Sequence, residues 1–225
     1  MSERAEPAWK QRAVERSIKS TRLRAEQRVQ RFLEAAQSII SENGSTDFTV
    51  QEVVERSRQS LRSFYLQFDG KHELLLALFE DALLRTAEQI RLAAAEEDDP
   101  LTRLGVAVQL LFSLCRSDPR DRHPLFTDFA PRLLVTHPAH VKVAHAPLLA
   151  LFVDLVTDAA SAGTLRPGLN PRRVAAMTMQ TVMFTAQSSG GQDDMATRPI
   201  TAEEVWEFCA AGVTGTGTGT GTGRT

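Results

Sequence analysis

Hydrophobic residues recur at helical spacing along most of the chain, and no segment shows the alternation of a β-strand. The first clear stripe predicts a helix that ends near Asn43 and Gly44. Its inner residues are Val29, Phe32, Leu33, Ala36, Ile39 and Ile40. The pattern therefore predicts an all-α fold.

Two short helices are predicted directly after this stripe. Thr49 with Glu52 forms a capping box that starts the first short helix, which places Val50, Val53 and Val54 inside. Ser60 is a second cap candidate a few residues later. Leu61, Phe64 and Phe68 recur at spacings of three and four, so we expect all three in the core. Two caps this close predict a helix-turn-helix.

The second short helix is then expected to turn polar residues outward, namely Arg62, Ser63, Tyr65 and Gln67. Such a helix can enter the major groove of DNA, where Arg reads guanine and Ser or Gln reads either base edge. Tyr65 suits a phosphate oxygen. Lys71 opens the next helix, so its ammonium and the free backbone N–H groups predict a phosphate site. Taken singly, Arg58 and Arg62 could equally be solvated charges.

This segment resembles the DNA-binding domain of the TetR family of transcriptional regulators. The matching positions are Phe32, Ala35, Ala36, Ile39, Gly44, Thr49, Val53, Ser60, Phe64, Tyr65, Phe68, Lys71, Glu73 and Leu74. The resemblance implies an N-terminal three-helix helix-turn-helix domain and a C-terminal helical domain for ligand binding and dimerisation. The DNA-binding residues expected from pattern and resemblance together are Thr49, Arg58, Gln59, Ser60, Leu61, Arg62, Ser63, Tyr65 and Lys71.

Two positions depart from the family pattern. Ser57-Arg58-Gln59 stands where the family usually has Ala-Gly-Val, and Arg62 stands where it usually has Gly. If Arg58 takes the left-handed conformation that Gly tolerates, the cost is about 1–2 kcal/mol. Both residues add positive charge beside DNA, so the operator sequence does not carry over from relatives.

Further helices are predicted along the rest of the chain. They cover Glu73 to about Glu97, Leu101 to Arg116, Ala139 to Ala162 despite Pro147, Asn170-Pro171 to Ser188, and a last helix that starts at the Thr201–Glu204 capping box. Breaks are expected at Pro119, Pro124 and Pro131, a polar loop at Ser189 to Asp194, and a flexible Thr-Gly tail from Thr214. The expected domains are a basic arm (1–25), the helix-turn-helix domain (26–75), the second helical domain (76–213) and the tail (214–225).

Charge is unevenly placed in this chain of 225 residues, whose net charge is −2. Residues 1–31 hold 9 basic and 4 acidic side chains. This segment is either a basic arm ordered on DNA or a solvated helix that leads into the first core helix. A basic arm of this kind raises nonspecific affinity for DNA.

Several classes of protein find little support in the sequence. No apolar run approaches the length that spans a bilayer, and the N-terminus lacks the apolar core of a signal peptide, so we expect a cytoplasmic protein without membrane contact. No catalytic constellation or cofactor motif is present, so we expect no enzyme and no cofactor. Cys115 and Cys209 are expected as buried thiols. His137, His140 and His145 are read as solvated or capping residues, and no metal site is expected.

The second half offers soft apolar side chains that are either core or the lining of a ligand cavity. The ligand-binding candidates are Phe112, Cys115, Phe126, Phe129, Phe152, Met177, Met183 and Phe184. The resemblance implies a small apolar ligand and a homodimer, for which residues 170–188 and 201–212 are the candidate interface. We expect a homodimeric repressor that binds palindromic double-stranded DNA and is released by that ligand. The alternatives are a regulator without a small ligand, and a helical enzyme or adaptor that keeps the helix-turn-helix as scaffold.

Overall fold

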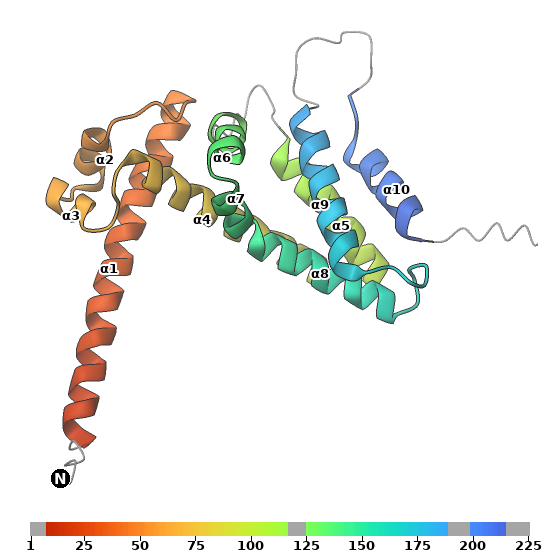
Figure 1. Ribbon diagram of the computed structural model, residues 1–225, viewed down its shortest axis with the longest axis horizontal. Helices are drawn as coiled ribbons and strands as arrows, with labels where there is room; N and C mark the ends of the chain where they lie inside the picture. The colour runs from red at the N-terminus through yellow and green to blue at the C-terminus, as the bar shows by residue number, and fades with distance from the viewer. Residues whose placement is uncertain (1–7, 117–124, 189–198, 215–225) are drawn as a thin grey trace, which may run out of the picture. The chain divides into compact units, whose positions relative to one another are not determined.

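The computed structural model describes residues 8–116, 125–188 and 199–214, and every regular element in these ranges is helical. The chain forms two compact units, one up to Leu78 and one from Phe79 onward. The elements are α1 (Ala8–Asn43), α2 (Val50–Ser57), α3 (Leu61–Tyr65), α4 (Lys71–Ala95), α5 (Pro100–Cys115), the π-helical turn η1 (Leu125–Phe129), α6 (Ala130–Thr136), α7 (Pro138–Ala144), α8 (Ala146–Ser161), α9 (Pro171–Ser188) and α10 (Ala202–Val213) (Figure 1).

The first unit is built on α1, which is one continuous helix across the basic segment and the predicted core stripe. Residues 9–24 are helical and all exposed, so their basic side chains face water in the absence of DNA. From Phe32 onward α1 contributes to the core, and α2 packs against this half (Figure 1). The predicted caps at Thr49 and Ser60 are confirmed, because each side chain accepts a hydrogen bond from the first turn of its helix.

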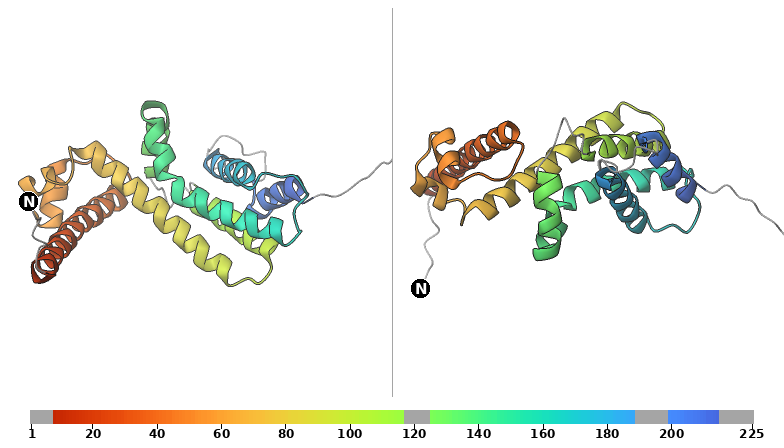
Figure 2. Two further views of the ribbon diagram at one scale, coloured as in Figure 1. Left: turned by 60° about the horizontal axis from the view of Figure 1, so that its bottom comes forward. Right: turned by 90° about the horizontal axis from the view of Figure 1, so that it is seen from above.

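The second unit is a bundle of α5, α8, α9 and α10, in which α5 contacts the other three (Figure 2). The inner face of α5 is buried and includes Leu104, Val108, Leu111, Phe112 and Cys115. Helix α10 comes close to α5 at Gly105, where a Cβ atom would lie 2.9 Å from the Trp206 ring. The predicted caps of α9 and α10 are confirmed at Asn170 and Thr201.

Some expectations were wrong. A single helix from Ala139 to Ala162 is replaced by α7 and α8, which meet at a 52° bend. Pro147 lies in the first turn of α8, because its ring clashes with the carbonyl four residues earlier and it lacks an N–H group. Pro131 likewise lies in the first turn of α6, which begins at Ala130. Leu61 was expected in the core and is 44% exposed, because α3 has only 5 residues and buries only Phe64.

Other expectations fall outside the described residues. These are the breaks at Pro119 and Pro124, the loop at 189–194, and the tail beyond Thr214. Helix α1 runs without interruption across residues 25 and 26, where the sequence placed a domain boundary. Among the described residues, no single helix has both the length and the apolar character for a membrane span; the bent pair α7 and α8 has them only when taken together.

Candidate DNA-binding surface and ligand cavity

The turn between α2 and α3 is set by local hydrogen bonds. The Thr49 hydroxyl accepts from the backbone N–H of Glu52 at 3.2 Å, and the Glu52 carboxylate accepts from the Thr49 N–H at 2.6 Å. The bond from the Thr49 N–H, with a second one from the Thr49 hydroxyl at 2.8 Å, holds the pKa of the Glu52 carboxyl below its usual range. Ser60 accepts from the N–H of Ser63 at 3.1 Å. Thr49 and Ser60, both expected to touch DNA, therefore use their hydroxyls to start the two helices.

Arg58 ends α2 in the left-handed conformation, with a φ of 54°. It is the only non-glycine residue with positive φ in the described chain. Its backbone N–H donates to Glu55 at 3.2 Å, and the next N–H, of Gln59, donates to Val54 at 3.2 Å. These two bonds satisfy carbonyls at the end of α2 that would otherwise lack partners. The chain thus accepts the expected strain and retains the turn.

Three aromatic rings support α3 from beneath. Phe64 is fully buried, and its ring centre lies 5.4 Å from those of Phe32 on α1 and Phe68 after α3. Phe32 also contacts Phe68 edge to face, at 6.1 Å. Such contacts add to the burial of apolar area. They fix the orientation of α3 on α1, so the residues opposite Phe64 must face solvent.

Helix α3 carries four of the nine predicted DNA contacts. Arg62 is exposed, Tyr65 is 56% exposed with its ring edge-on to Phe64, and Ser63 is half-buried. The exposed Leu61 shares this end of the helix. Arg58 lies exposed in the preceding turn, and the half-buried Gln59 donates from its amide to the Arg58 carbonyl at 3.3 Å. The surface therefore offers a guanidinium, a phenol and a hydroxyl beside one another along the chain.

Lys71 opens α4 and has two partners within the first unit. Its ammonium lies 3.5 Å from a carboxylate oxygen of Asp47 and 4.8 Å from the centre of the buried Phe48 ring. The Glu73 carboxylate accepts from the N–H of Asp69 just before the helix. Lys71 is thus held at a helix N-terminus, where backbone N–H groups favour an anion.

One contact that orients α2 was not found in the sequence. Arg56 donates to Glu42 of α1 through both guanidinium nitrogens, one of them at 2.8 Å, and also to the hydroxyl of Ser38 at 2.8 Å. These hydrogen bonds hold the pKa of Glu42 below its usual range. Glu42 and Arg56 lie 14 positions apart on different helices, so no local signal marks the pair.

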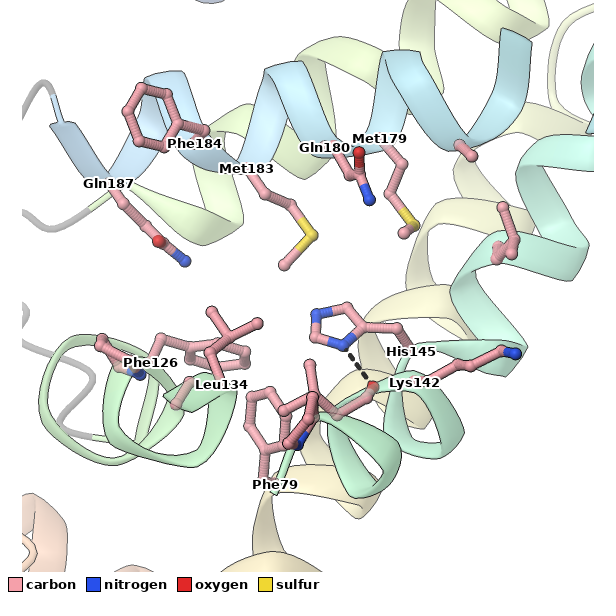
Figure 3. A pocket seen from close by; sticks show the side chains of 16 residues that line it. Phe79, Phe126, Leu134, Lys142, His145, Met179, Gln180, Met183, Phe184 and Gln187 are labelled. Atoms are coloured by element: carbon pink, nitrogen blue, oxygen red, sulfur yellow. Dashed lines mark hydrogen bonds between the residues drawn. The ribbon is translucent and has the colours of Figure 1, made fainter. Parts of the chain in front are cut away.

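The second unit holds a cavity of about 450 Å³ between α4, η1, α6, α7, α8 and α9. Its walls are mostly apolar, with Phe79, Leu134 and Met183 among them, and Gln180, Gln187 and His145 supply polar atoms (Figure 3). This size and composition are typical of sites for small organic molecules.

The eight predicted ligand-binding residues fall into three groups. Phe126, Met183 and Phe184 line the cavity. Phe112, Cys115, Phe129 and Phe152 are buried and do not line it. Met177 is 68% exposed on α9 and does not line it either. Sequence reasoning missed Phe79, Val141 and His145 as cavity residues. Val141 and His145 lie one turn apart at the end of α7, whereas Phe79 lies on α4, far from them along the chain.

The titratable groups of this unit have distinct surroundings. Burial lowers the pKa of His145, although a hydrogen bond from its ring to the Val141 carbonyl opposes this. Burial raises the pKa of Cys115 to about 12, and both cysteines are free thiols. His137 and His140 are exposed and stack at 5.3 Å. No group of three metal-ligating side chains occurs in the part of the chain that the structure describes.

Large apolar side chains are exposed on the last two helices. Met177 and Phe184 lie seven residues apart on α9, so they share a face, and Phe208 on α10 is 72% exposed. Such residues mark an interface when they cluster, but singly they are ordinary.

Comparisons with known proteins agree on one family. The family model of bacterial regulatory proteins of the tetR family matches residues 32–78. The uncharacterized HTH-type transcriptional regulator YvdT of Bacillus subtilis is 29% identical over 83 residues, which span 37% of this chain and 43% of YvdT. The matched segment thus spans less than half the length of that relative.

Solved structures extend the likeness of fold to both units. FadR from Bacillus subtilis, in complex with stearoyl-CoA, has a TM-score of 0.59 and 18% identity over 81% of this chain and 98% of that one. RolR in complex with resorcinol has a TM-score of 0.62 and 17% identity over 84% of this chain and 87% of RolR. SmeT, the repressor of a multidrug efflux pump of Stenotrophomonas maltophilia, has a TM-score of 0.59 and 18% identity over 84% of this chain and 91% of SmeT. Residues 32–78 therefore belong to the DNA-binding domain of the TetR family of transcriptional regulators, and the solved structures show that the fold of both units is shared as well.

Proposed function

We propose that this regulator is a homodimeric repressor that binds a palindromic operator and is released from it by a small apolar ligand. The observation that carries the proposal is the pairing, in one chain, of an exposed reading face on α3 with an apolar cavity in the second unit. The proposed DNA contacts are the expected nine residues. Arg62 and Ser63 read base edges, while Tyr65 and Lys71 bind phosphates. Its place of action is the cytoplasm, with the DNA.

Dimerisation is supported by the exposed apolar residues of α9 and α10. Met177, Phe184 and Phe208 lose contact with water if two copies pair these helices. A pair related by twofold symmetry presents two recognition helices to successive major grooves, which explains the proposed palindrome. The proposed interface is residues 170–188 and 201–212.

Release by ligand is supported by the position of Phe79. This residue lines the cavity and lies on α4, whose first residues, from Lys71, follow the recognition helix in the first unit. A ligand that pushes against Phe79 can shift or rotate α4 at this point. Only a ligand with different affinities for the DNA-bound and free forms changes their populations, so the ligand must favour the form that does not fit the operator.

Two steps test this function. Purified protein is mixed with genomic fragments, and the bound DNA is recovered and sequenced. The proposal expects a shared palindrome and a dimer on each fragment. A panel of apolar compounds is then titrated into the complex. Release by at least one compound, at a concentration that also raises the melting temperature of the free protein, is the expected result. Stable binding to DNA that no compound reverses would favour a regulator without a small ligand.

A further inference from the structure

The polar group that best defines the cavity is the imidazole of His145. Its Nδ1 atom lies 2.8 Å from the backbone oxygen of Val141, one turn earlier. A carbonyl oxygen can only accept a hydrogen bond, so Nδ1 carries the proton. In the neutral ring the other nitrogen, Nε2, then has a lone pair and no hydrogen. The backbone of α7 thus fixes which nitrogen of the ring is the acceptor.

This acceptor faces the cavity. His145 lines the cavity, and Figure 3 shows its second ring nitrogen turned toward the space below Met183. Among the residues that the structure describes, none makes a hydrogen bond to this Nε2 atom. Phe79 holds the ring from another side, with the ring centres 5.5 Å apart and the planes at 69°. The ring is therefore fixed by α4 and α7 while its lone pair remains available.

The rest of the lining excludes an anionic partner. Lys142 is the one cationic residue of the lining, and its ammonium points away from the cavity (Figure 3). Gln180 and Gln187 are neutral. A carboxylate or phosphate placed against His145 would lose its hydration without meeting a positive charge. A molecule with no hydrogen-bond donor would leave Nε2 without a partner and is also disfavoured.

The aromatic and sulfur-bearing walls narrow the ligand further. Phe79, Phe126 and Phe184 line the cavity together with Met179 and Met183. Aromatic rings and thioether groups favour a flat aromatic ligand through edge and sulfur contacts. We propose that the cavity binds a neutral phenol whose hydroxyl group donates a hydrogen bond to Nε2 of His145. This inference rests on the proposed function, because it names the ligand class of the same cavity.

Three matched probes test the inference with the full-length protein. They are 4-phenylphenol, which has a hydroxyl donor; 4-methoxybiphenyl, which has the same rings and no donor; and biphenyl-4-carboxylate, which is an anion. Dissociation constants are measured by titration calorimetry at neutral pH. The phenol is expected to bind about tenfold more tightly than the ether, since the ether leaves the acceptor unpaired. The carboxylate is expected to bind more weakly than the phenol.

Variants assign this preference to one side chain. The dissociation constant of the ether divided by that of the phenol measures the preference. In His145→Phe this ratio is expected to fall to about one, because the acceptor atom Nε2 is gone. His145→Gln retains a side-chain acceptor and is expected to keep part of the preference. His140→Phe is the matched control, because His140 is exposed and does not line the cavity; it retains the wild-type ratio. If a variant fails to fold, the ratio of the ether and phenol dissociation constants in the wild-type protein still tests whether the cavity prefers a hydroxyl donor.

The outcomes separate this inference from the proposed function. Equal binding of phenol and ether to the wild type, tightest binding of the carboxylate, an unchanged ratio in His145→Phe, or no binding of any probe would each overturn the phenol site. Release of operator DNA by apolar compounds without a hydroxyl would still support the repressor. Selective binding of 4-phenylphenol that leaves the DNA complex intact would support the phenol site and contradict ligand-driven release.

Discussion

The ammonium of Lys71 lies 3.5 Å from a carboxylate oxygen of Asp47, at the N-terminus of α4. The Asp47 side chain is 97% exposed, so the ion pair is screened by water and contributes little to stability. The same ammonium is the proposed ligand of a DNA phosphate. A phosphate oxygen must therefore compete with Asp47 for Lys71.

Removal of this competitor should strengthen DNA binding. In Asp47→Asn the affinity for operator DNA is expected to rise several-fold, because the full charge of Lys71 is available to a phosphate. The slope of log K against log salt should steepen by about one. Fluorescence anisotropy at several salt concentrations measures both. Asp154→Asn, which removes the same charge from an exposed position on α8, should leave affinity nearly unchanged. Equal or weaker binding by Asp47→Asn argues against a phosphate at Lys71.

The strained turn gives a prediction about stability. Arg58→Gly should raise the free energy of unfolding by up to about 1.5 kcal/mol, since Gly relieves about 1–2 kcal/mol of left-handed strain and loses about 0.5–1 kcal/mol to chain entropy. Arg62→Gly removes the same side chain from the helical backbone of α3 and should destabilise by about 1 kcal/mol. Urea unfolding compares the two. Destabilisation by Arg58→Gly would mean that the Arg58 side chain makes a contact worth more than the strain.

Local signals made the helix-turn-helix predictable. The capping hydrogen bonds of Thr49 and Ser60 join residues three positions apart, so residue type and spacing reveal them. Resemblance to the family likewise identified Arg58 as the residue in place of the turn glycine, and its φ confirms the left-handed conformation. Leu61 was misplaced because periodicity alone does not say how short α3 is.

The cavity was much harder to predict. Phe126, Met183 and Phe184 were named because large soft side chains are common in such sites. Phe79 and His145 were not, because their roles depend on where α4 and α7 meet in space. The break between α7 and α8 at His145 was missed for a related reason. The apolar residues keep a helical spacing across it, and spacing alone does not show that Pro147 starts a new helix. Tertiary packing therefore decides the site, while local chemistry decides the helices.

The proposed interface predicts a change in oligomeric state. Phe208→Glu places a charge on an exposed apolar position of α10 within the proposed interface and should raise the dimer dissociation constant at least about tenfold. Sedimentation velocity over a concentration series measures this constant. Leu92→Glu alters a similarly exposed side chain on α4 and should leave it unchanged. A dimer that tolerates Phe208→Glu must pair through another surface.

Burial of His145 predicts a pH dependence of stability. Its folded-state pKa lies below the ordinary value of about 6.5. The unfolded chain therefore binds a proton more readily, so this contribution to stability is present above about pH 6.5 and declines as the pH falls below it. The drop in melting temperature between pH 7.5 and 5.5 should be smaller in His145→Gln than in the wild type. The exposed His140→Gln should keep the wild-type drop, and identical drops in all three proteins would contradict the account.

The most direct test of DNA recognition uses one recovered operator and one scrambled sequence of the same length. Anisotropy titrations compare the wild type with Tyr65→Ala, Lys71→Ala and Arg62→Ala. The first two should weaken binding to both sequences, because phosphate contacts do not depend on sequence. Arg62→Ala should mainly reduce the preference for the operator, by about 1–3 kcal/mol at the affected base pair. Wild-type affinity and preference in all three variants would contradict the assignment of α3 and Lys71 as the DNA-reading surface.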